Sequence, residues 1–384
     1  MIAKHFPGEW KKSFNDYNYF LPASLKQSQE IQLSPHIFRH MQNAAFALGK
    51  FSSLIERIPN PHQFIHAYAV KEAQLSSRIE GTQTNIEDAL KTETEIEPEK
   101  HDDWAEVQAY IKAMNEALDQ RNELPLCNRL IKNAHKTLLS QVRGQHKFPG
   151  EFRTSQNWIG GSRPDNAHYV PPAHEHIGEL MSDLEKFIQD NTLVMPELIN
   201  AAFLHYQFET IHPFLDGNGR MGRMLISLYF LEKKLLKHPI LYISTFFEEH
   251  RTNYYAALDK AREGSEGVSK WVSFFLDAVE QTAQDGIEVT QKLLDYDLKL
   301  RTEILPQFGR KTKDTLRVLE FLYRRPILTS RQLQEQLEFS PQVSQNMLKL
   351  LAEHNILQEI TGNKRNRVFM FHQYITLLEG KKET

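Results

Sequence analysis

Residues 212–223, with the sequence HPFLDGNGRMGR, combine small and charged side chains in an order suited to phosphate chemistry. Gly217 and Gly219 let the backbone turn and approach a ligand without a Cβ in the way. A helix is expected to begin near Asn218, and the free N–H groups of a helix N-terminus bind anions, of which phosphate is the usual one. The segment therefore predicts a phosphate-binding turn.

The charged and ionisable side chains of the same segment suggest a reaction. The carboxylate of Asp216 offers hard oxygen ligands for Mg²⁺ beside a pyrophosphate. Arg220 and Arg223 are three residues apart on one helix face, where their guanidinium groups could hold the β- and γ-phosphates. His212 stands at a loop entry stiffened by proline and is a candidate general base toward a hydroxyl. Singly, these residues could belong to an ordinary turn, but together they favour a nucleotide-dependent catalytic site.

The 212–223 segment resembles the signature of Fic-domain proteins. The FLPASL segment at 20–25 and the SSRIEGT segment at 76–82 also look like this family, so the resemblance spans nearly the whole chain. It implies transfer of AMP from ATP to Ser, Thr or Tyr of a target protein, with self-modification also open. On this resemblance the base is His212 and the Mg²⁺ ligand is Asp216. The α-phosphate would be held by Asn218 and the flanking amides of Gly217 and Gly219. The outer phosphates would be held by Arg220 and Arg223. Amides, guanidinium groups and Mg²⁺ would stabilise the charge that develops during transfer.

A second motif lies upstream. Ser76 and Glu80 are spaced i and i+4 on one helix face, with Gly81 as the helix stop. A solvated glutamate at a helix end is the simpler interpretation. However, Ser-x-x-x-Glu-Gly is similar to the inhibitory motif of many Fic proteins, in which the glutamate reaches the second signature arginine, here Arg223. Glu80 would then lie in the ATP site, force ATP into an unproductive pose and make the chain autoinhibited. Whether it also supports removal of AMP stays open.

Other segments could complete the nucleotide site. EFRTSQNWIGGSR at 151–163 resembles the β-hairpin flap of the family, which aligns a target segment by strand pairing. An ordinary Gly-Gly turn is the alternative. The flap-tip residues expected to touch nucleotide are Ile159, Gly160, Gly161 and Ser162. Tyr254 and Tyr255 are adenosine-pocket candidates by resemblance, although helically spaced aromatic residues are more often core. Gln207 could line the same pocket.

Helical periodicity dominates the rest of the chain, so the fold class expected is mainly α: a Fic-type helical core with a β-hairpin flap and a C-terminal winged helix-turn-helix. Thr84 is expected to cap the helix after Gly81, with Glu87 as its capping-box partner. The expected helices cover about 36–58, 61–81, 104–120, 126–140, 174–190, 196–210, 219–235, 250–263 and 268–300. The expected domains are 1–100 with the inhibitory helix, 101–300 as the catalytic core, and 311–384 as the winged helix.

The C-terminal unit suggests a rival function. Residues 311–384 hold 12 Lys and Arg against 8 Asp and Glu, and GNKRNR at 362–367 forms a basic wing tip that could touch phosphate. The expected recognition helix has a single basic residue, Lys349. Four of its polar residues could read the edges of DNA bases: Gln342, Ser344, Gln345 and Asn346. A winged helix is also often only a packing or dimerisation module.

The rival function is that of a DNA-binding transcriptional regulator whose core senses nucleotide. The intact His212 argues against it, because a pure sensor needs no base. Transfer of UMP or phosphocholine is a further alternative.

Composition limits the remaining classes. Over 384 residues the chain is 40% hydrophobic and 25% charged, as expected of a folded globular protein. A net charge of −3 argues against a molecule that binds nucleic acid through overall charge. A single cysteine, Cys127, fits a reducing compartment. With no apolar run of about 18 residues and no signal-like N-terminus, we expect no membrane contact and a cytoplasmic location. A homodimer that buries or releases residues 65–80 is an open possibility.

Overall fold

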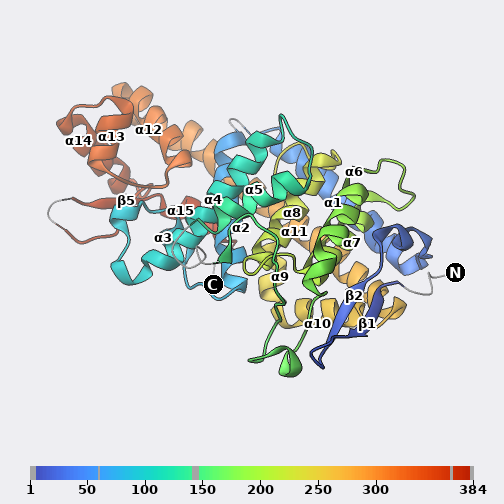
Figure 1. The fold of residues 1–384 in the computed structure, drawn as a ribbon. Coiled ribbons are helices and arrows are strands. Elements are labelled where there is room, and N and C mark those ends of the chain that lie inside the picture. The colour runs from blue at the N-terminus through green and yellow to red at the C-terminus, as the bar shows by residue number, and fades with distance from the viewer. Residues whose placement is uncertain (1–5, 59–60, 141–146, 364–365, 381–384) are drawn as a thin grey trace.

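The computed structural model describes residues 6–58, 61–140, 147–363 and 366–380, and these are mainly helical, as predicted (Figure 1). The chain starts with an antiparallel hairpin of β1 (Gly8–Lys12) and β2 (Asn18–Pro22), in which Gly8 pairs with Pro22. No helix in the described part of the chain is both long enough and apolar enough to cross a bilayer.

Three helices form the N-terminal part: α1 (Pro35–Ile55), α2 (Pro61–Ile79) and α3 (Ile86–Leu90). The side chain of Ser34 caps α1 by accepting a hydrogen bond from the N–H of Ile37. The expectation that Thr84 caps α3 is wrong, because Asn85 accepts from the N–H of Asp88 instead. The chain therefore turns into α3 one residue later than the sequence suggested.

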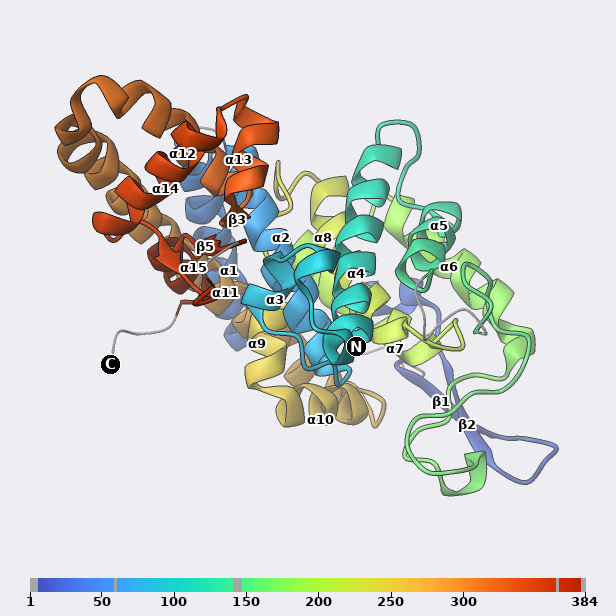
Figure 2. The same ribbon diagram turned by 90° about the vertical axis from the view of Figure 1, so that its left-hand side faces the viewer.

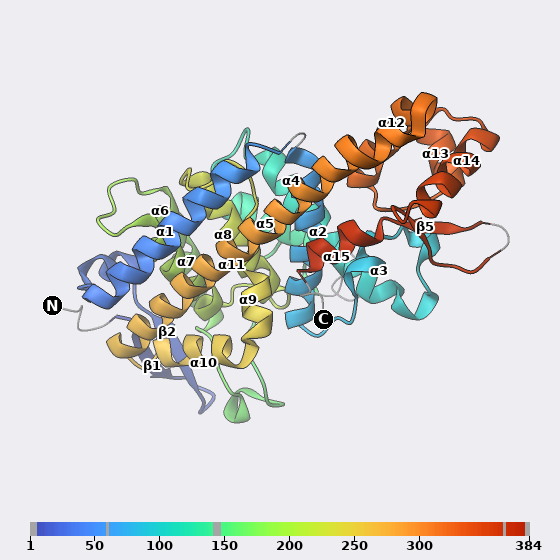
Figure 3. The same cartoon turned by 180° about the vertical axis from the view of Figure 1, so that it is seen from behind.

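The central part is built around two buried helices, α7 (Glu197–Ile211) and α8 (Asn218–Glu232). Every residue of α7 after the first is buried, which fits a helix that is apolar on all sides and lies inside a helical core. The surrounding helices are α4 (His101–Gln120), α5 (Asn128–Leu138), α6 (Ile177–Gln189), α9 (Ser244–Glu249), α10 (Arg251–Ala261) and α11 (Ser265–Lys299). The long α11 packs along α1, and the two helices run side by side in Figure 3.

The C-terminal unit comprises α12 (Thr312–Arg324), β3 (Ile327–Thr329), α13 (Ser330–Leu337), α14 (Pro341–Glu353), β4 (Gln358–Glu359), β5 (Val368–Met370) and α15 (His372–Glu379). Its antiparallel sheet has the strand order β3-β5-β4. The α12 and α15 helices both pack against α2, so this unit lies directly on the N-terminal helices, as Figure 2 shows.

Two features of the C-terminal unit bear on the expected DNA contacts. Ser344 is buried, so it is not among the side chains of α14 that could read base edges, whereas Gln342, Gln345 and Asn346 are exposed. Lys349 forms an ion pair with Glu353 on its own helix. The predicted wing residues Lys364 and Arg365 lie outside the described residues.

Candidate active site

The loop between α7 and α8 is held in shape by its own sequence. At the end of α7, His212 adopts a left-handed conformation, with φ 50° and ψ 59°. Gly217, with φ 75°, takes the same region just before α8. Inside the loop, the buried side chain of Asn218 accepts from the N–H of Phe214 and donates to its carbonyl oxygen, both at 2.9 Å. These contacts leave the loop little freedom to rearrange.

A histidine from another helix supports this loop. The N–H of Gly150 donates to Nδ1 of His135 on α5 at 2.9 Å, so Nε2 carries the proton and donates to the carbonyl oxygen of Asp216, also at 2.9 Å. The imidazole stacks on Phe214 with ring centroids 3.6 Å apart. Burial lowers the pKa of His135 to about 4, so it is neutral. Sequence reasoning missed this residue.

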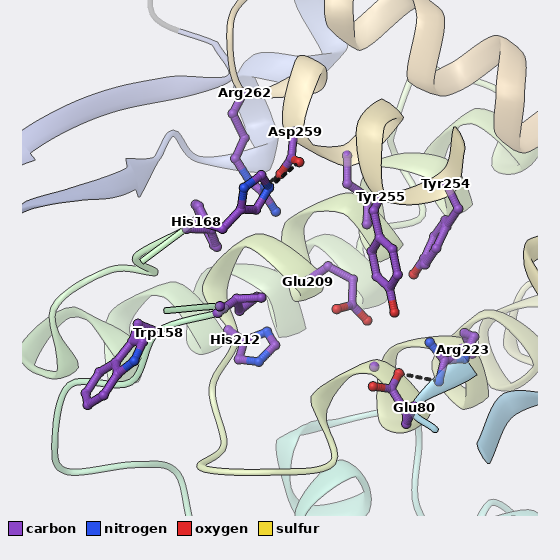
Figure 4. Close-up of a pocket in the computed structure, with 15 residues that line it drawn as sticks. Glu80, Trp158, His168, Glu209, His212, Arg223, Tyr254, Tyr255, Asp259 and Arg262 are labelled. Carbon is purple, nitrogen blue, oxygen red and sulfur yellow. Dashed lines mark hydrogen bonds and ion pairs between the residues drawn. The ribbon is translucent and has the colours of Figure 1, made fainter. Parts of the chain in front are cut away.

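The predicted pairing of Glu80 with Arg223 is present (Figure 4). The buried guanidinium of Arg223 donates from Nε to the hydroxyl of Ser76 at 2.9 Å and from NH2 to Oε1 of Glu80 at 2.7 Å. It also donates to the carbonyl oxygen of Ser76 at 2.8 Å. Burial opposes the charge on Glu80, but the attraction and hydrogen bond of Arg223 outweigh it, so the pKa of Glu80 is lowered. The carboxylate is therefore ionised at neutral pH.

The carboxylate of Glu80 also occupies the start of α8. A Cβ built on Gly219 would lie 2.2 Å from Oε1 of Glu80, so the carboxylate rests directly on the glycine backbone. This is the helix N-terminus that the sequence predicted as an anion site. The other signature arginine, Arg220, is buried and forms an ion pair with Glu106 on α4 at 3.2 Å. Both arginines expected to hold phosphates thus face carboxylates of the chain itself.

A cavity of about 600 Å³ opens beside this pair, between the end of α2, the predicted flap and α10 (Figure 4). The predicted residues that line it are Glu80, Ile159, Gly160, His212, Gly219, Arg223, Tyr254 and Tyr255. The lining residues that sequence reasoning missed are Trp158, His168, Tyr169, Glu209, Leu258, Asp259 and Arg262. The structure therefore brings together the candidate base His212, Glu80 and the second arginine, Arg223, around one cavity.

Some predicted nucleotide contacts lie elsewhere. The buried side chain of Gln207 donates to the carbonyl oxygen of Ala23 at 2.9 Å, so it fastens the N-terminal segment to α7 rather than lining the cavity. Gly161 and Ser162 form a turn with Asn166, whose Oδ1 accepts from the N–H of Ser162 at 3.0 Å. The remaining signature residues form the loop beside the cavity without contributing to its wall: Asp216, Gly217, Asn218 and Arg220.

The predicted flap is not a regular hairpin in the described residues. One antiparallel bridge joins Ile159 to Tyr169, with N–H to carbonyl distances of 2.8 and 3.1 Å. Side-chain contacts with α10 hold it instead. Asp259 accepts from His168 at 2.7 Å and pairs with Arg262 at 2.7 Å, while the guanidinium of Arg262 lies 3.7 Å from the centre of the Tyr169 ring. These contacts close the cavity opposite Glu80.

The two adjacent tyrosines of α10 have different surroundings. Tyr254 is buried, and its hydroxyl donates to Nε2 of His205 at 2.8 Å, while Nδ1 of His205 donates to the carbonyl oxygen of Gly222 at 3.1 Å. Burial lowers the pKa of His205 to about 3, so this ring is neutral. Tyr255 is 39% exposed and faces the cavity, as Figure 4 shows. Tyr255 is thus the better placed of the two to stack on a base.

Glu209 is the most conspicuous residue that the sequence analysis missed. It precedes His212 by one helical turn, its side chain is buried, and its Oε1 has no hydrogen-bond partner among the described residues. Burial raises its pKa to about 7. Its spacing from His212 on a helix could have revealed it, since residues three apart share a helix face.

The surroundings of Asp216 suit a metal ion only in part. Its Oδ1 accepts from the N–H of Gly217 at 2.6 Å. In the described part of the chain, no cluster of three or more His, Cys, Asp and Glu side chains could hold a metal ion. Mg²⁺ is commonly held by one or two carboxylates together with substrate phosphates, and Asp216 fits that pattern.

Two regions of the chain match models of a known protein family. Residues 38–119 match the Fic/DOC family N-terminal region, and residues 125–230 match the Fic/DOC family domain. These matches identify a Fic-type N-terminal region and a Fic domain within the chain. Among solved structures, a Fic family protein from Desulfovibrio desulfuricans shares the fold with a TM-score of 0.55 at 19% identity, over 88% of this chain and 97% of that one. A Fic domain containing signaling protein from Bacteroides thetaiotaomicron gives a TM-score of 0.51 at 18% identity, over 65% and 97%.

Curated relatives of this chain are called protein adenylyltransferase Fic. The relative from Culex quinquefasciatus is 29% identical over 196 residues, which are 51% of this chain and 36% of the relative. The relative from Drosophila persimilis is 28% identical over 248 residues, which are 63% and 44%. The chain thus spans less than half the length of these relatives.

Proposed function

We propose that this protein transfers AMP from ATP to a hydroxyl side chain of a target protein, and that Glu80 inhibits the transfer. The observation that carries the proposal is the pairing of Glu80 with Arg223 at the edge of a cavity that His212 also lines. The relatives named protein adenylyltransferase Fic support the same activity.

His212 is the proposed general base. Burial and the nearby charge of Arg153 lower its pKa to about 4, so the imidazole is unprotonated at neutral pH and can accept a proton. An anionic nucleotide bound beside the ring would raise this pKa toward the range of an effective base. The proton of the acceptor hydroxyl would pass to the imidazole as the hydroxyl oxygen attacks the α-phosphate.

The N-terminus of α8 and the two signature arginines are proposed to stabilise the phosphates. Negative charge develops on the α-phosphate oxygens and on the departing pyrophosphate, and fixed amides and guanidinium groups stabilise such charge. Asp216 would hold Mg²⁺, which when bound neutralises part of the phosphate charge. In the structure Arg223 faces Glu80, whose carboxylate also covers the backbone of Gly219. A γ-phosphate would have to displace this carboxylate, which is the proposed basis of inhibition.

The test is incubation with Mg²⁺ and ATP radiolabelled at the α-phosphate, comparing wild type, Glu80→Gly and Glu80→Gly/His212→Ala. We expect label on protein with Glu80→Gly, little with wild type and none with the double variant. Equal labelling of wild type and Glu80→Gly would reject inhibition by Glu80. No label in any variant, with ATP still bound, would reject AMP transfer and favour a nucleotide sensor or another donor.

We also propose a three-part organisation: residues 1–100 with the inhibitory helix, 101–300 as the catalytic core, and 311–384 as a winged helix-turn-helix. The order helix, strand, two helices and two strands from α12 to β5 supports the last assignment.

A further inference from the structure

Arg153 lies at the start of the predicted flap, beside the signature loop, and is only 3% exposed. Its backbone N–H donates to the carbonyl oxygen of Pro213 at 2.9 Å. Its guanidinium group donates to four further carbonyl oxygens, those of His212 (3.0 Å), Ile211 (3.4 Å), Ser155 (3.1 Å) and Pro172 (2.5 Å). One side chain therefore joins the end of α7 to the start of the predicted flap and to Pro172, which follows the flap in the chain.

The partners of Arg153 are unusual for a buried arginine. Buried cations are normally paired with a carboxylate, but in the described residues Arg153 forms no ion pair, and each hydrogen-bond acceptor that it meets is a backbone carbonyl. Burial lowers the pKa of Arg153 to about 10, so it remains charged at neutral pH. Among the described residues, no carboxylate forms an ion pair with this buried charge, although Tyr169, Tyr17 and Glu175 act electrostatically to raise its pKa.

The positive charge of Arg153 lies at the C-terminal end of α7, where hydrogen-bond donors and a positive charge stabilise a helix. The last carbonyl groups of a helix have no partner inside the helix, and the C-terminus carries the negative end of the helix dipole. Here the helix ends with His212 at φ 50°, a conformation that non-glycine residues adopt only when their surroundings impose it. Asn157 assists by donating to the carbonyl oxygen of Phe214 at 2.9 Å. Arg153 supplies both the donors and the charge that stabilise this ending.

The same charge acts on the imidazole of His212. Burial is the largest influence that disfavours protonation of this ring, followed by Arg153. Arg262, at the end of α10, acts in the same direction, whereas Glu80 on α2 and the backbone of Glu209 favour protonation. Among the charged side chains, Arg153 is thus the main influence that keeps the ring neutral.

We infer that Arg153 is a positioning residue that fixes His212 in its left-handed conformation, facing the cavity. Its positive charge also acts on the imidazole. The inference rests on the proposed role of His212 as base. The side chain of Arg153 makes two contributions, the geometry of its hydrogen-bond donors and its positive charge. Different substitutions of Arg153 remove one or both of them.

The experiment compares Arg153→Lys and Arg153→Met with the Glu80→Gly parent by two measurements. The first is the pKa of the His212 imidazole, from NMR titration of isotope-labelled histidine in the nucleotide-free protein, with His212→Ala to assign the signal. The second is the rate of AMP transfer against pH. Arg39→Met is the matched control, because Arg39 is an exposed arginine on α1, outside the candidate active site.

Arg153→Met should raise the imidazole pKa by roughly one unit, move the acid limb of the rate profile to higher pH and lower the rate by about a hundredfold. Arg153→Lys keeps the charge but lacks the planar fork, so the pKa should stay near that of the parent while the rate falls about tenfold or more. Arg39→Met should change neither measurement.

An imidazole pKa that is the same in Arg153→Met and the parent would overturn the electrostatic role. A parental rate in Arg153→Lys would overturn the positioning role, and this variant carries the test if Arg153→Met fails to fold. If the parent itself transfers no AMP, the proposed function fails, but the NMR titration still decides what Arg153 does to His212.

Discussion

Lys71, on the helix α2 that directly precedes Glu80, donates from Nζ to the carbonyl oxygens of Leu378 at 2.9 Å and Glu379 at 3.3 Å. These carbonyls end α15, where helix carbonyls lack partners, so the ammonium group caps that helix. Because α2 also packs against α4, α8 and α9, it lies between the catalytic core and the C-terminal unit. The C-terminal unit therefore bears directly on the helix that places Glu80.

This contact predicts that Lys71→Met raises AMP transfer by the otherwise wild-type protein. Loss of charge-assisted hydrogen bonds, each worth about 1.5–3 kcal/mol, should loosen α2 and release Arg223 part of the time. We expect a rise of about fivefold, smaller than that of Glu80→Gly, with faster hydrogen exchange in α2. Lys112→Met is the control, because Lys112 is exposed on α4. Unchanged transfer and exchange in Lys71→Met would show that the C-terminal unit does not restrain α2.

Gly219→Ala should break the contact between Glu80 and Arg223 without raising AMP transfer. The added Cβ would lie 2.2 Å from Oε1 of Glu80 and 3.0 Å from NH1 of Arg223, so the carboxylate must move. The same methyl group would fill the space that a phosphate needs, so ATP affinity measured by calorimetry should fall in both the wild-type and Glu80→Gly backgrounds. ATP affinity in Glu80→Gly/Gly219→Ala equal to that of Glu80→Gly would mean that phosphate does not approach this glycine.

Tyr255 should contribute to ATP binding through its ring. Stacking of a base on an aromatic side chain is worth about 1–3 kcal/mol, so in the Glu80→Gly background Tyr255→Ala should raise the KM for ATP roughly tenfold with a smaller effect on kcat. Tyr255→Phe keeps the ring and should keep the KM. Equal KM values for the parent and Tyr255→Ala would place the base elsewhere in the cavity.

Acid should destabilise the protein through its buried neutral histidines. In the native state the pKa is about 3 for His205 and about 4 for His135 and His212, whereas the ordinary value is 6.5. Between pH 6.5 and 4 the unfolded chain therefore binds protons that the native chain does not, so the free energy of unfolding contributed by these groups falls as pH falls.

His205→Gln should make this dependence shallower by up to about 1.4 kcal/mol per pH unit, measured by denaturant unfolding across that range. His372→Gln changes an exposed histidine and should leave the slope unchanged. A wild-type slope in His205→Gln would show that His205 is not held neutral in the native protein.

Some of the site could be predicted from local sequence because its causes are local. The signature loop follows from Gly217 in a left-handed turn and from the start of a helix at Asn218. Ser76 and Glu80 point to the same side because residues spaced i and i+4 share one face of a helix. By contrast, only family resemblance indicated that Glu80 would meet Arg223, since no spacing in the sequence encodes a contact between residues so far apart.

Tertiary packing decided the rest. Gln207 turns toward Ala23 instead of the cavity, because α7 is buried on all sides and its face toward the N-terminal segment also needs partners. His135 and Arg153 contact the signature loop from segments that are far from it in the sequence. No spacing of residues around either one predicts this contact. Local sequence fixes which backbone turns and helix faces form, since both depend on near neighbours. Which distant side chains complete the site depends on how those elements pack, and only the folded chain determines that.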